Sequence, residues 1–61
     1  MTRRDYVLVA FALQAALDRP GLTDLEQSGI ELATRQIASA LVADNPGFDA
    51  KHFYRTVGIP E

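Results

Sequence analysis

A run of seven apolar residues, positions 7–13, lies inside a segment that otherwise has the pattern of a single helix. At about 100° per residue these side chains surround the helix axis and do not line one side of it. One stripe consists of Tyr6, Val9, Ala10, Leu13, Ala16 and Leu17, and a second, on roughly the opposite side, consists of Val7, Leu8, Phe11, Ala12 and Ala15. A chain this short cannot cover both stripes. The sequence therefore predicts that this helix also packs against a second copy, another protein or a membrane.

The size and composition of the chain indicate one folded domain of marginal stability. A chain of 61 residues buries only about 60% of its unfolded surface. It has no cysteine, which excludes disulfides and thiolate metal sites and fits a reducing compartment. Hydrophobic residues make up 48% of the chain and charged residues 23%, as in globular proteins. The net charge of -2 gives no overall attraction to nucleic acid or anionic lipid.

The first helix is predicted over about 3–18. Thr2 and Asp5 have the spacing of a capping box, in which a threonine hydroxyl and an acidic side chain satisfy free backbone N–H groups. Pro20 cannot continue a helix, and Pro20-Gly21 suits the central positions of a type II turn. The first helix is therefore expected to end shortly before this turn.

Two further helices are predicted, over about 24–44 and 50–57. Thr23 and Glu26 form a second capping box, and Asp49 is in the position of an N-cap for the last helix. We therefore expect an all-α fold, an antiparallel helical hairpin followed by a short third helix, in one domain spanning 1–61.

A hydrophobic staple is predicted where the last helix begins. Phe48 and Phe53 occupy the positions just before the N-cap and four residues into the helix, a spacing at which two apolar side chains meet and fix the entry angle. We expect the staple to set only this angle, so that losing Phe48 would loosen 50–57 and spare the hairpin. Gly58 is expected to end the helix, since Pro60 prevents its continuation.

The second helix has one clear apolar face, Ile30, Ala33, Ile37, Ala40 and Leu41, with Thr34 and Ala38 at its edge. Leu25 and Leu32 fall on a different side, where they would either extend an intermolecular surface or cover the tip of the first helix. The interface with a partner is accordingly predicted to consist of Val7, Leu8, Phe11, Ala15, Leu25 and Leu32, and to join two chains into a helix bundle.

Two stretches resemble small uncharacterised proteins of actinobacteria and their phages. The first is Arg4-Asp5-Tyr6 with Ala10 to Leu13, and the second is Leu41 to Asp49 followed by Phe53, which contains the turn Asp-Asn-Pro-x-Phe-Asp. The resemblance covers about two thirds of the chain and implies a setting but no biochemical role. Positions corresponding to Val7 and Phe11 are typically polar in such proteins, which makes these two residues candidates for a surface particular to this chain.

No catalytic, cofactor or metal site is predicted. His52 is the only histidine, so zinc would have almost no ligands. Asp44 and Asp49 are explained by helix termination and capping, and their turn lacks the regularly spaced oxygen ligands of a calcium loop. Serine and threonine have no basic partner at a supported spacing, and there is no glycine-rich phosphate loop. We expect a protein that is not an enzyme.

A basic cluster gives the alternative hypothesis. Antiparallel packing of the first two helices would bring Arg3, Arg4, Lys51 and Arg55, together with His52, to one end of the molecule, where helix 50–57 could act as a recognition helix on DNA. The same end also carries Asp5, Asp44 and Asp49, and the last helix lacks a set of residues suited to reading base edges. Nucleic-acid binding is therefore ranked second.

The apolar run is too short for a membrane span, which needs about 20 residues. Asp5 between the arginines and the run argues against a secretory signal. We expect a cytoplasmic protein, in the host cell if phage-encoded. The favoured function is a homodimeric protein-interaction or adaptor module, such as a phage-encoded modulator of a host protein, and the alternative is a DNA-associated accessory factor.

Overall fold

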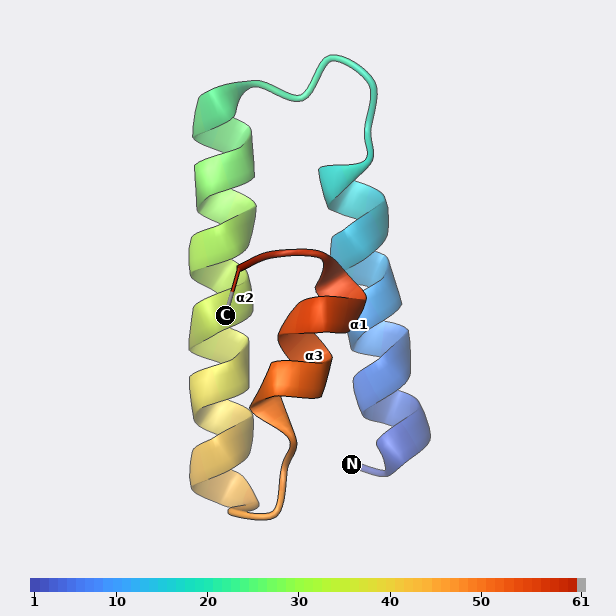
Figure 1. Ribbon diagram of the computed structural model, residues 1–61, viewed down its shortest axis with the longest axis vertical. Helices are drawn as coiled ribbons and strands as arrows, with labels where there is room; N and C mark the ends of the chain where they lie inside the picture. The colour runs from blue at the N-terminus through green and yellow to red at the C-terminus, as the bar shows by residue number, and fades with distance from the viewer. Residues whose placement is uncertain (61) are drawn as a thin grey trace.

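The structure is a computed structural model that describes residues 1–60, and this part of the chain contains three helices and no strand. Helix α1 spans Arg3–Leu17, α2 spans Asp24–Asp44 and α3 spans Ala50–Val57. These bounds agree with the predicted helices to within one residue, and the all-α prediction is confirmed. In Figure 1, α1 and α2 lie side by side along the long axis, and the shorter α3 lies against both on one face.

Both predicted capping boxes are present. The Asp5 carboxylate accepts a hydrogen bond from the backbone N–H of Thr2 at 2.9 Å, and the Thr2 hydroxyl accepts one from the N–H of Asp5 at 3.4 Å. At the start of α2, Glu26 and Thr23 make the same reciprocal pair, both at 3.1 Å. These backbone hydrogen bonds stabilise the charged carboxylates and lower the pKa of both Asp5 and Glu26.

The turn between α1 and α2 has the predicted geometry. The carbonyl of Arg19 accepts a hydrogen bond from the N–H of Leu22 at 3.3 Å, and Gly21 has a φ of 76°. A type II turn requires a positive φ at this position, which glycine adopts without the steric cost of a side chain. The Pro20-Gly21 prediction is therefore confirmed, and the turn leads the chain from the end of α1 to the start of α2.

The core is centred on α3. Phe53, Val57 and Ile59 are all buried, and α1 and α2 each contribute a small side chain, Ala10 and Ala38, to the same cluster. The chain can bury Ile59 directly after the helix because Gly58 adopts a left-handed conformation with a φ of 96°, which ends α3 and redirects the backbone. The short third helix is thus the element around which the other two pack.

The position of α3 corrects the predicted apolar face of α2. Thr34 and Ala38, placed at the edge of that face, are fully buried, whereas Ala33 and Ala40, placed within it, are exposed. The prediction considered only α1 as a neighbour of α2. Because α3 also packs on α2, the side of α2 that is buried faces α3 as well. Thr34 tolerates burial because its hydroxyl donates to the carbonyl of Ile30 at 2.8 Å.

The structure also corrects the limited role assigned to Phe48. The predicted staple is present, since the rings of Phe48 and Phe53 meet edge to face with centroids 5.5 Å apart. Phe48 in addition contacts Tyr6 of α1 in an edge-to-face arrangement at 4.8 Å, and it packs against the core. Phe48 therefore joins α1 to α3, and does more than set the angle at which α3 leaves the turn.

Candidate interaction surfaces

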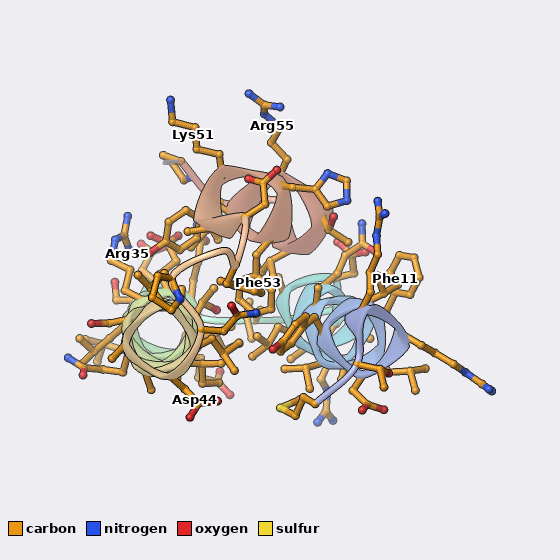
Figure 2. All side chains as sticks on the ribbon, turned by 90° about the horizontal axis from the view of Figure 1, so that it is seen from below. Phe11, Arg35, Asp44, Lys51, Phe53 and Arg55 are labelled. Atoms are coloured by element: carbon orange, nitrogen blue, oxygen red, sulfur yellow. The ribbon has the colours of Figure 1, made fainter. Side chains whose placement is uncertain are left out.

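The outer side of α1 presents large apolar side chains to solvent. Ala10, on the inner side, is 1% exposed, whereas Leu8 is 56% and Phe11 is 53% exposed. Figure 2 shows Phe11 on the side of α1 that faces away from α2. Ala12 and Ala15 are exposed as well, and Val7 is half-buried. The second apolar stripe of the helix is thus only partly covered within one chain.

Leu25 and Leu32 lie apart from this α1 surface. They are 86% and 61% exposed, so they do not cover the tip of α1, which was one of the two roles considered for them. On a helical wheel both lie about 160 to 180° from Thr34, the residue that α2 buries completely. They therefore point away from α1 and α3, and the six predicted interface residues belong to two separate patches.

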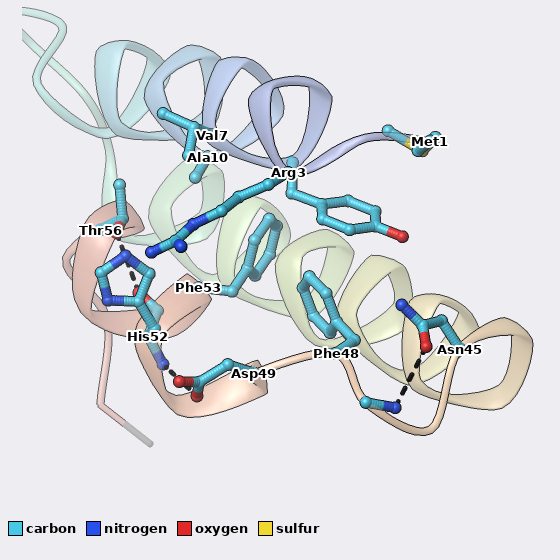
Figure 3. Close-up of a pocket in the computed structure, with 12 residues that line it drawn as sticks. Met1, Arg3, Val7, Ala10, Asn45, Phe48, Asp49, His52, Phe53 and Thr56 are labelled. Carbon is cyan, nitrogen blue, oxygen red and sulfur yellow. Dashed lines mark hydrogen bonds between the residues drawn. The ribbon is translucent and has the colours of Figure 1, made fainter.

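A pocket of about 490 Å³ lies between the start of α1 and α3 (Figure 3). Its lining is mixed: Tyr6, Phe48 and Phe53 contribute aromatic rings, and Arg3 and His52 contribute polar groups. Two of the hydrogen-bonding side chains that line the pocket are engaged within α3. The Asp49 carboxylate accepts from the N–H of His52 at 3.0 Å, and the Thr56 hydroxyl donates to the carbonyl of His52 at 2.9 Å. These interactions cap and stabilise α3.

The predicted basic residues are distributed over different parts of the molecule. Arg3 and His52 line the same pocket, while Lys51 and Arg55 extend from the side of α3 that faces away from α1 and α2 (Figure 2). Arg4 is about 100° around α1 from Arg3 and is exposed. The candidate nucleic-acid residues are therefore an outward pair on α3 and two arginines on different sides of α1.

Two other kinds of site have no counterpart in residues 1–60. In this part of the chain no three histidine, cysteine, aspartate or glutamate side chains come together in a way that could hold a metal ion. None of its helices combines the length and the apolar character that crossing a membrane requires.

Comparison with known proteins found no matching family model, curated protein or solved structure. The resemblance to actinobacterial and actinophage proteins therefore stays a prediction. On the outer side of α1, Leu8 and Phe11 lie beside the exposed Ala12 and Ala15, so this side differs from an ordinary solvated helix face.

Proposed function

We propose that this protein is a small helical interaction module, without enzymatic activity, that works as a homodimer formed through the outer side of α1. The observation that carries the proposal is the exposure of Leu8 and Phe11 on a helix whose opposite side already packs in the core. Transfer of such side chains out of water is favourable by about 25 cal/mol per Å² of apolar surface. A second copy brings the same side chains and buries both sets at once.

The dimer would be the form in which the module acts, as an adaptor or as a modulator of another protein in the cytoplasm. A phage-encoded modulator of a host protein is the setting that fits the resemblance noted in the sequence. The small size supports this role, because a chain that buries little of its own surface gains much of its stability from association.

Phe11→Glu tests the proposed surface. It places a charge where the partner would pack, so at micromolar concentration the variant is expected to sediment as a monomer. Because Phe11 is half exposed in the single chain, the monomer should remain folded, which the helical circular dichroism signal reports.

Leu32→Glu is the matched control, since it introduces the same charge at an apolar residue of similar exposure on α2. It is expected to leave the mass unchanged. Equal loss of dimer in both variants would contradict the assignment of the interface to α1, and an unchanged mass for Phe11→Glu would remove that surface altogether.

A further inference from the structure

The exposed side of α1 carries an ordered pattern of charge as well as apolar residues. Positions spaced by three and four residues lie on one side of a helix, and here they are Arg4, Val7, Leu8, Phe11, Ala15 and Asp18. The first is basic, the last is acidic and those between are apolar. Asp18 belongs to this series because its N–H still bonds the carbonyl of Gln14 at 3.0 Å, as in a helix.

Both terminal charges are unfavourably placed in their own helix. The N-terminus of a helix carries a partial positive charge and the C-terminus a partial negative charge, yet Arg4 lies in the first turn and Asp18 at the C-cap. Among the described residues, the side chains of Arg4 and Asp18 form no hydrogen bond or ion pair. Arg19, the next residue, lines a groove between the end of α1 and the start of α2 together with Leu13 and Ala16.

We propose that two copies pair their α1 helices antiparallel, with the two-fold axis at Phe11 and with Arg4 of each copy opposite the partner's Asp18. This pairing rests on the proposed function, namely dimerisation through α1. Arg4 precedes Phe11 by seven positions and Asp18 follows it by seven, which is about two turns in each direction. Rotation about the axis therefore exchanges the two charged positions.

The same rotation relates Val7 to Ala15 and places Leu8 at the level of the partner's Gln14, at the edge of this surface. Val7 lies four residues before Phe11 and Ala15 four residues after, so the larger side chain of one copy meets the smaller one of the other. Each Arg4 comes beside the C-terminus of the partner's α1, and each Asp18 beside its N-terminus, so both charges become favourable toward the opposing helix dipole. Parallel pairing would instead place Arg4 beside Arg4 and Asp18 beside Asp18.

A charge-exchange experiment tests this register. Arg4→Glu and Asp18→Arg are studied separately, mixed in equal amounts, and combined in one chain. Each variant alone would have two like-charged contacts in its homodimer, and we expect its dissociation constant to rise about tenfold, the size typical of exchanging exposed ion pairs for repulsion. The mixture should form a heterodimer, identified by native mass spectrometry, because all its charge pairs are again opposite. The doubly substituted chain should regain the original affinity.

Unfolding does not account for the expected losses. Glu at the start of α1 and Arg at its end both agree with the helix dipole, so each variant should be at least as helical as the original protein. Arg3→Glu is the matched control, with the same charge change one residue earlier, toward the pocket, and it should leave the dissociation constant unchanged. The single variants should also recover affinity in 1 M salt, where charges are screened beyond about 3 Å.

The outcomes separate the pairing from the proposed function. If the original chain dimerises but Arg4→Glu and Asp18→Arg each form homodimers as tight as its own, as parallel pairing would allow, the antiparallel register is wrong while the α1 interface stands. If Arg4→Glu and Arg3→Glu weaken the dimer equally, the charge pattern along α1 does not set the register. If the original chain is a monomer throughout, the proposed function itself fails.

Discussion

Replacement of Phe53 by alanine should unfold the whole chain, although the residue lies in an eight-residue helix. Phe53 is 3% exposed, and truncation of a buried phenylalanine typically costs about 3–5 kcal/mol. Its edge-to-face contacts with Phe48 and Tyr54 are lost too, and such pairs contribute about 0.5–1.5 kcal/mol each. A chain of this length has a total stability of roughly 3–9 kcal/mol at the usual 0.05–0.15 kcal/mol per residue.

The assay is a urea titration followed by far-ultraviolet circular dichroism, at a concentration kept equal for all variants. We expect Phe53→Ala to lose most of its helical signal without denaturant, in proportion to all three helices and not to α3 alone. Phe53→Leu, which keeps most of the apolar volume, should retain a cooperative transition at a lower midpoint. A Phe53→Ala chain that keeps the signal of α1 and α2 and loses only that of α3 would refute the central position of α3 in the core.

Three further outcomes are expected. Phe48→Ala should lower the urea midpoint by less than Phe53→Ala, because Phe48 is only half-buried, and should remove the fixed environment of Tyr6 seen by near-ultraviolet circular dichroism; an unchanged tyrosine signal would contradict the Tyr6 contact. The pKa of Glu26 is lowered in the folded state, so its capping interaction stabilises the fold above the unfolded-state pKa, and this stabilisation is lost as the pH falls through the folded-state pKa. The melting temperature should therefore decline below about pH 4.5, and it should decline less in Glu26→Gln. Equal declines in the two proteins would argue against the cap. Despite Lys51 and Arg55, the protein at micromolar concentration should not retard duplex DNA in a gel-shift assay at about 0.15 M salt, where non-specific binders have dissociation constants of about 10⁻⁴ to 10⁻⁶ M. A salt-sensitive gel shift that is abolished when Lys51→Ala and Arg55→Ala are combined would favour the DNA-associated alternative.

Local signals in the sequence were sufficient for the helices and their ends. The capping boxes at Thr2 and Thr23 and the turn at Gly21 depend on residues within four positions of one another, and the structure has all three. The staple between Phe48 and Phe53 is local in the same sense. Such features follow from backbone hydrogen bonding and sterics, which do not depend on how distant elements pack.

The packing between elements could not be predicted in the same way. Which side of α2 is buried depends on where α3 docks, and the buried pair Thr34 and Ala38 is only weakly apolar, so the sequence pattern placed it at the edge of the predicted face and not at its centre. The available signal was the amphipathic pattern of α3, with Phe53 and Val57 one turn apart and a small pair at the same spacing on α2 to receive them. The exposure of Leu8 and Phe11 followed from the two stripes on α1, because no arrangement of so few elements covers both.

Self-association of the unmodified chain is the claim on which the functional account depends. Sedimentation equilibrium over about 1–100 µM protein in 0.15 M salt measures it directly, because the mass is obtained without a shape assumption. The account predicts a reversible, concentration-dependent rise to twice the 6.7 kDa mass of the chain. A mass of 6.7 kDa at every concentration, with the helical signal intact, would contradict it.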